Sequence, residues 1–149
     1  MDLTRRPRRL RQDGIRSMVR ETEVRPTDLI APVFVDATAE ERIPIPSMPG
    51  HERVPLDQVL ERVEEVLSTG IESVILFGVP REKDPEGSRA WAADGVIQEA
   101  TRRVSEATDA YLITDVCLCE YTDHGHCGVL EPGAPDEVTL TVDNDPTLD

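Results

Sequence analysis

Lysine and aromatic residues are scarce in this chain. Lys83 is the only lysine, the other 15 of its 16 basic residues are arginines, and aromatic residues make up 3% of the 149 positions. Aliphatic side chains must therefore fill most of any core. No apolar run approaches the roughly 18 residues that a transmembrane helix needs, and no apolar segment follows Arg5-Arg6. We therefore expect a cytoplasmic protein without a membrane span or an export signal.

Several common sequence motifs are also missing. No G-x-G-x-x-G follows the first predicted strand, and the chain has neither a P-loop nor a G-x-S-x-G sequence. The first absence argues against a dinucleotide-binding Rossmann domain, and the other two argue against a P-loop NTPase and an α/β-hydrolase.

Acidic residues dominate the charge of the chain. Residues 1–20 carry seven arginines against Asp2 and Asp13, a local net charge of +5, so a total of -14 leaves -19 on the other residues. A dense acidic surface with almost no lysine is typical of proteins adapted to high salt, where self-repulsion is screened. The alternative is an ordinary acidic enzyme.

The basic residues gather at the N-terminus, where residues 5–11 form a cluster that includes Pro7. Because proline disfavours a helix there, we predict an N-terminal arm over residues 1–26. Such a cluster can bind nucleic acid, or it can pack on an acidic neighbouring subunit. The acidity of the rest of the chain favours the subunit, so we expect no nucleic-acid partner.

Apolar patterns predict strands that alternate with helices. Near-continuous apolar runs, typical of strands covered on both faces, predict strands over residues 29–35, 73–78 and 110–116. Helical spacing predicts helices over residues 56–67, ending at Gly70, and 96–107, capped by Asp94. Residues 36–55 are predicted to be a loop, residues 138–142 a short hairpin arm, and Asn144 the start of another helix.

This βαβαβ order predicts a parallel α/β sheet with right-handed crossovers. With the Rossmann motif missing, we predict the N-terminal portion of a (β/α)8 TIM barrel. A complete barrel takes about 250 residues, so residues 27–149 are expected to supply three of about eight units and to leave the barrel incomplete. Active sites of such barrels lie at the C-terminal ends of the strands, and Asp115 lies at the end of the third predicted strand.

All three cysteines of the chain, Cys117, Cys119 and Cys127, lie in the segment 115–128, which begins at the end of this strand. Thiolates are ligands that suit zinc, and three protein ligands with one open position are typical of a catalytic zinc site. Three alternatives stay open: inert core thiols, a disulfide with one thiol left over, and a redox pair at Cys117 and Cys119. The last lacks C-x-x-C spacing.

The segment 115–128, which reads DVCLCEYTDHGHCG, is similar to the zinc-site signature of the porphobilinogen synthase family, also called 5-aminolevulinate dehydratase. Further stretches along the chain resemble the same family. They are residues 6–11, 28–35, 45–50, 77–80, 83–90 and 142–148.

The resemblance implies a TIM barrel with an N-terminal arm, usually assembled as a homo-octamer. It implies condensation of two 5-aminolevulinate molecules to porphobilinogen, an early step of haem and other tetrapyrrole biosynthesis. Cys117, Cys119 and Cys127 would bind zinc, Asp115 would line the active site, and His126 would lie near it. Magnesium is a second candidate metal.

The sequence departs from the family pattern in its lysines. The family forms Schiff bases on two lysines in the later half of the barrel, whereas Lys83 matches a loop position. We therefore expect the 149-residue chain alone to be inactive. The alternative function is a non-catalytic zinc-binding module with a basic arm.

Overall fold

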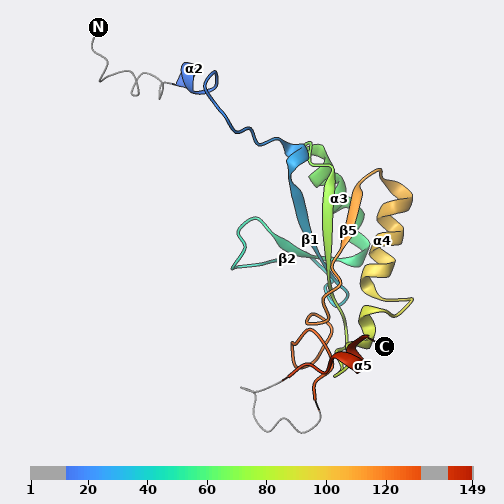
Figure 1. Ribbon diagram of the computed structural model, residues 1–149. Helices are drawn as coiled ribbons and strands as arrows, with labels where there is room; N and C mark the ends of the chain where they lie inside the picture. The colour runs from blue at the N-terminus through green and yellow to red at the C-terminus, as the bar shows by residue number, and fades with distance from the viewer. Residues whose placement is uncertain (1–12, 132–140, 149) are drawn as a thin grey trace.

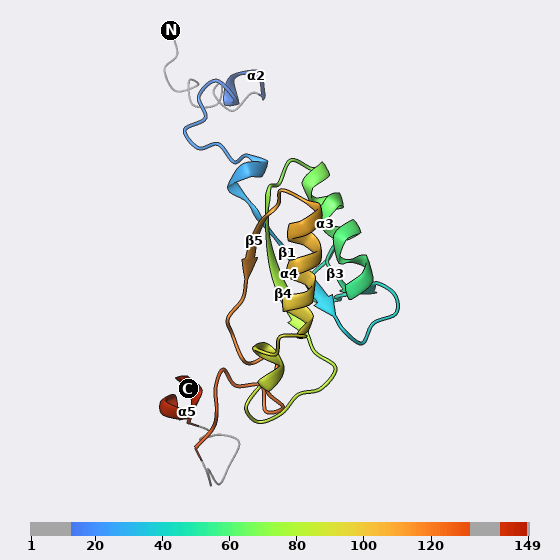
Figure 2. The same ribbon diagram turned by 90° about the vertical axis from the view of Figure 1, so that its right-hand side faces the viewer.

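The computed structural model describes residues 13–131 and 141–148. These residues contain a five-stranded sheet with two long helices on one face (Figures 1 and 2). The order of the strands across the sheet is β2-β3-β1-β4-β5. Their bounds are β1 (Ile30–Asp36), β2 (Ile43–Pro44), β3 (Glu52–Pro55), β4 (Ser73–Val79) and β5 (Tyr111–Thr114).

The three predicted strands are confirmed as β1, β4 and β5, which are parallel and adjacent in sequence order. Phe34 pairs with Phe77, and Leu76 pairs with Thr114. The third strand ends two residues earlier than predicted. The Asp115 amide lies 3.5 Å from the Leu76 carbonyl oxygen, too far for a normal hydrogen bond, so the ladder stops before the cysteines.

The prediction of a plain loop over residues 36–55 is wrong, because this segment supplies β2 and β3. β3 pairs parallel with β1, from Phe34–Arg53 to Asp36–Pro55, and β2 pairs antiparallel with β3. The sequence concealed β3 because its four residues include only one aliphatic side chain, that of Val54. The Val54 side chain is fully buried. Its packing in the folded protein therefore stabilises β3 although the local sequence gives only a weak strand signal.

Two long helices cover one face of the sheet (Figure 2). They are α3 (Val59–Ser68), preceded by a 3-10 turn at Leu56–Gln58, and α4 (Val96–Ala107). Their apolar stripes meet β1, β3 and β4 in a core made only of aliphatic residues, as the scarcity of aromatic residues predicts. The core comprises Val33, Val35, Val54, Val59, Val63, Val66, Val74, Leu76, Val96, Ile97, Ala100 and Val104.

The two terminating residues predicted for these helices, Gly70 and Asp94, have different outcomes, whereas the bounds predicted for α4, 96–107, are confirmed. Gly70 follows α3 with a φ of 88°, the left-handed conformation that favours glycine at a helix end. The prediction that Asp94 caps α4 is wrong, since Gly95 occupies the N-cap and makes no side-chain cap bond. The Asp94 carboxylate instead accepts a hydrogen bond from Arg89 at 3.1 Å.

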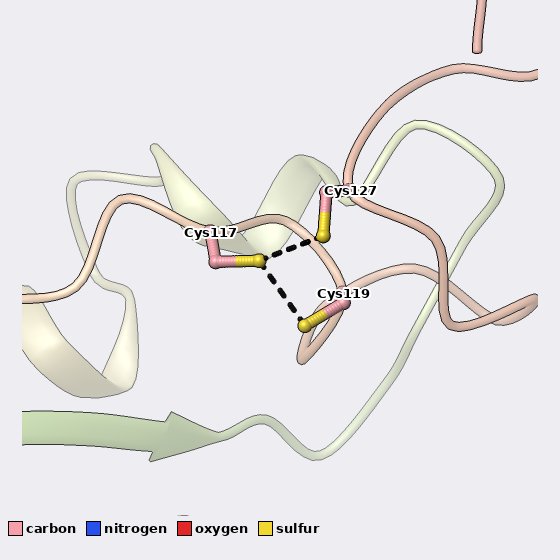
Figure 3. A group of neighbouring side chains, drawn as sticks. All are labelled: Cys117, Cys119 and Cys127. Carbon is pink, nitrogen blue, oxygen red and sulfur yellow. Dashed lines mark hydrogen bonds between the residues drawn. The ribbon is translucent and has the colours of Figure 1, made fainter.

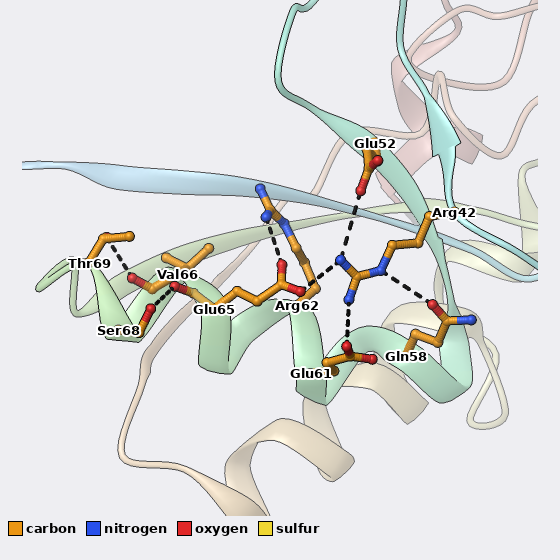
Figure 4. Close-up of polar contacts among 9 residues, drawn as sticks. All are labelled: Arg42, Glu52, Gln58, Glu61, Arg62, Glu65, Val66, Ser68 and Thr69. Atoms are coloured by element: carbon orange, nitrogen blue, oxygen red, sulfur yellow. Dashed lines mark hydrogen bonds and ion pairs between the residues drawn. The ribbon is translucent and has the colours of Figure 1, made fainter.

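A half-buried arginine, Arg42, joins the segment before β2 to helix α3 (Figure 4). The Arg42 guanidinium lies 2.8 Å from a Glu65 carboxylate oxygen, 3.4 Å from Glu61 and 3.9 Å from Glu52. Arg62 donates a second hydrogen bond to Glu65, and these two arginines hold the Glu65 pKa below its ordinary value. This network holds the β2–β3 segment against α3, away from the cysteines.

Two short helices lie near the termini: α2 (Asp13–Arg16), and α5 (Asn144–Leu148), which confirms the helix expected from Asn144 onward. Two predicted features fall outside the described residues, namely the basic cluster at residues 5–11 and residues 138–140 of the hairpin arm. Val142 does form an antiparallel bridge with Leu130. No helix in the described ranges is both long enough and apolar enough to cross a membrane.

Candidate metal centre

The sulfur atoms of Cys117, Cys119 and Cys127 converge beyond the C-terminal end of β5 (Figure 3). The Cys117 Sγ lies 3.1 Å from that of Cys119 and 3.0 Å from that of Cys127, and all three lie within 4.8 Å of one another. All are free thiols, which contradicts the disulfide interpretation. Their convergence also contradicts the interpretation as separate inert thiols in the core.

The three thiols perturb one another's acidity. Hydrogen bonds with the Cys127 thiol, and then with the backbone and thiol of Cys119, lower the pKa of Cys117. The hydrogen bond with Cys117 is also the main reason why the pKa of Cys119 rises to about 12 and the pKa of Cys127 is raised. The Cys117 thiol, at the centre of the group, is therefore the most acidic of the three. Three crowded sulfur ligands fit a soft divalent cation, and a tetrahedral ion bound to them would keep one coordination position open.

Glu120 ties the cysteine segment to the sheet. Its carboxylate accepts a hydrogen bond from the backbone N–H of Gly78, in β4, at 3.1 Å. Burial raises the Glu120 pKa, and the hydrogen bond from Gly78 opposes that shift. This contact spans 42 residues of sequence and places the segment over the end of β4.

Tyr121 anchors the same segment from the side of the helices. It is 5% exposed, and burial, followed by the nearby carboxylates of Glu120 and Asp115, raises its pKa to about 12. A Cβ atom on Gly78 would lie 2.5 Å from the Tyr121 hydroxyl and 2.7 Å from the Ile97 side chain. Only glycine at this position leaves room for the buried tyrosine.

Comparison with known proteins identifies the family. The family described as Delta-aminolevulinic acid dehydratase matches residues 4–149 of this chain. The chain belongs to this family. It is 52% identical over 129 residues to the Delta-aminolevulinic acid dehydratase of Archaeoglobus fulgidus, covering 86% of this chain and 40% of the relative. It is 49% identical over 151 residues to that of Halalkalibacterium halodurans, covering 99% and 44%.

A solved structure of the dehydratase family supports the same assignment. The chain matches delta-aminolevulinic acid dehydratase of Toxoplasma gondii, solved in complex with the reaction product porphobilinogen, with a TM-score of 0.79 and 36% identity. The match covers 96% of this chain and 40% of the Toxoplasma chain. The chain therefore spans about two-fifths of the length of these relatives. The predicted fold class, part of a (β/α)8 barrel, is confirmed.

The dehydratase assignment leaves the alternative interpretations without support. No comparison favours a non-catalytic zinc module. The basic cluster that would bind nucleic acid lies outside the described residues.

The structure places the other predicted site residues close to the sulfurs, but not among them. Asp115 and Cys117 both line a cavity of about 580 Å³ between α4 and the segment after β5. The His126 ring packs edge-on against that of His124, with ring centroids 5.6 Å apart. Neither histidine joins the group of three sulfurs.

The sequence prediction missed the residues that support the cysteines. Glu120, Tyr121 and Gly78 carry no signal in periodicity, because the segment after β5 is irregular and its contacts are distant in sequence. The one available signal is the glycine near the C-terminal end of β4, since a glycine inside a strand indicates a close approach of other atoms.

Replacing Gly78 with Ala is expected to disturb the metal centre without touching a cysteine. The added methyl would overlap the Tyr121 hydroxyl, and such overpacking costs about 1–3 kcal/mol of unfolding free energy. We expect a lower urea midpoint and weaker retention of a bound metal ion. Gly14→Ala is the matched control, because a Cβ there meets no atom within 4 Å. Equal urea midpoints for the two variants would show that the Tyr121 side chain moves aside without a loss of stability.

Proposed function

We propose that this chain forms the metal-binding part of a porphobilinogen synthase, which condenses two 5-aminolevulinate molecules to porphobilinogen in tetrapyrrole (haem) biosynthesis. The observation that carries the proposal is the convergence of three cysteine sulfurs at the C-terminal edge of the sheet, in a chain of the dehydratase family. That edge is where barrel enzymes of this kind hold their reacting groups.

Zinc is the metal that we propose for Cys117, Cys119 and Cys127, because three thiolates with one open position match its catalytic sites. When bound, zinc would supply a Lewis acid next to the substrate. Asp115 would line the substrate site, and His126 would lie beside it. Magnesium, which prefers oxygen ligands, would have to bind away from the sulfurs.

The assembly and location of the whole protein also belong to this proposal. We propose residues 1–26 as an arm that packs on a neighbouring subunit and residues 27–149 as the first barrel units. The family resemblance implies a homo-octamer, and the composition and charge of the sequence favour the cytoplasm without nucleic-acid or membrane partners. Residues 14–29 are exposed except for half-buried Ile15, as an arm free to contact another subunit requires.

Metal analysis of the purified chain tests the proposed zinc site. We expect about one zinc per chain after equilibration and removal of free metal, with sulfur atoms at roughly 2.3 Å in X-ray absorption spectra. Excess magnesium should not displace the zinc, because hard oxygen-preferring cations compete poorly for thiolates. A zinc-free chain, or a first shell made only of oxygen and nitrogen, would contradict the proposal.

A further inference from the structure

Two loops that are distant in sequence are joined beside the cysteines. Asp84, in the loop that follows β4, pairs through its backbone with the turn between Cys119 and Cys127. Its N–H donates to the Tyr121 carbonyl at 3.3 Å, and its carbonyl accepts from the Asp123 N–H at 3.2 Å. These two bonds make an isolated parallel bridge between Asp84 and Thr122. The first loop therefore acts as a support for the second.

The Asp84 side chain keeps its own loop in shape. Its carboxylate accepts hydrogen bonds from the Glu86 N–H at 3.0 Å, the Ser88 N–H at 3.1 Å and the Ser88 hydroxyl at 2.5 Å. Gly87 completes the turn with a φ of 69°, and a Cβ there would lie 3.2 Å from the Thr122 methyl. The supporting loop is thus closed upon itself and packed against Thr122.

Thr122 connects the supporting loop to the backbone next to the third cysteine, Cys127. It is 1% exposed, and its hydroxyl donates to the His126 carbonyl at 2.8 Å. That carbonyl belongs to the peptide bond that leads into Cys127. A second contact acts in parallel, with His124 Nε2 lying 3.1 Å from the Pro85 carbonyl oxygen. The turn is therefore held at both ends of the 123–126 segment.

We infer that Thr122 and Asp84 are positioning residues that set the place of the Cys127 thiol relative to Cys117 and Cys119. Cys127 is exposed, whereas Tyr121 in the same segment is buried. Without support, the nine residues between Cys117 and Cys127 would have to close as a flexible loop, at a cost in conformational entropy. The inference rests on the proposed metal site and names the residues that preorganise it.

Zinc affinity tests the inference through a matched set of variants. Thr122→Val removes the hydroxyl but keeps the shape, and it should weaken zinc binding about 10- to 100-fold, as loss of groups that orient metal ligands does. Thr122→Ser keeps the hydroxyl and should restore most of the affinity. Asp84→Ala removes the carboxylate that holds the other loop in shape, and it should weaken zinc binding in the same range. Thr69→Val is the control, because it removes a similar hydroxyl-to-carbonyl bond at the end of α3.

Two further measurements separate positioning from a general loss of structure. The cobalt-substituted Thr122→Val chain should show weaker sulfur-to-metal charge-transfer absorption per metal than the Thr69→Val control. Without metal, diamide should form the disulfide between Cys127 and Cys117 or Cys119 more slowly in Thr122→Val than in Thr122→Ser. Circular dichroism of each variant should match the unaltered chain.

The outcomes distinguish this inference from the proposed function. A chain that binds zinc equally well with Thr122→Val and Thr69→Val would overturn the positioning role and leave the zinc site standing. A chain that takes up no zinc, yet forms the disulfide fast only when residue 122 carries a hydroxyl, would overturn the zinc proposal and support the positioning role.

Discussion

Cys119→Ala is expected to strip most of the zinc from this chain. One of three sulfurs is lost, and its partner Cys117 lies only 3.1 Å away at the centre of the group. Sites of this chemistry bind zinc with about 10–16 kcal/mol of apparent free energy, so one ligand in three accounts for roughly 3–5 kcal/mol. The affinity should therefore fall by a factor on the order of 10² to 10⁴.

The experiment measures zinc content and competition with a chromophoric chelator. Val116→Ala is the matched control, because this side chain lies in the same segment, is 89% exposed and offers no ligand. The control should keep its zinc. Unchanged zinc in Cys119→Ala would mean that the three sulfurs do not bind the metal together.

A polypeptide made only of residues 1–149 is expected to form no porphobilinogen, even when it is loaded with zinc. The family resemblance implies a reaction that needs lysines that form Schiff bases, and an effective lysine is desolvated or lies beside another cation. Lys83 is the only lysine of this chain; it is exposed and stands between Glu82 and Asp84. A bound metal can polarise a substrate, but it supplies no covalent link to the first one.

Borohydride trapping tests this expectation. The chain is incubated with 5-aminolevulinate and borohydride, and the mass of the intact polypeptide is measured, with Lys83→Arg as the matched control. We expect no stoichiometric adduct in either protein. An adduct present in the unaltered chain and absent in Lys83→Arg, together with pyrrole product in an unreduced sample, would refute the assignment of Lys83 as a loop residue.

The main scaffold could be predicted from the sequence because its signals are local. Continuous apolar runs indicated β1, β4 and β5, and helical spacing indicated α3 and α4. Gly70 marked the end of α3 because a left-handed residue there favours glycine. Asp94 was misassigned since an acidic residue near a helix start resembles a cap, while its actual partner, Arg89, lies in a short 3-10 helix, Ser88–Ala90, that precedes α4.

The sequence alone identified the candidate metal ligands, because a cysteine thiol can bind a metal ion by virtue of its residue type. Whether the sulfurs meet is a different matter, since Cys117 and Cys127 are ten residues apart in an irregular stretch. Only the tertiary structure decided that, through the bond from Gly78 to Glu120 and the support of Thr122 by Asp84. It also decided that β3 joins the sheet beside β1. These contacts join residues far apart in the chain, and no local pattern records them.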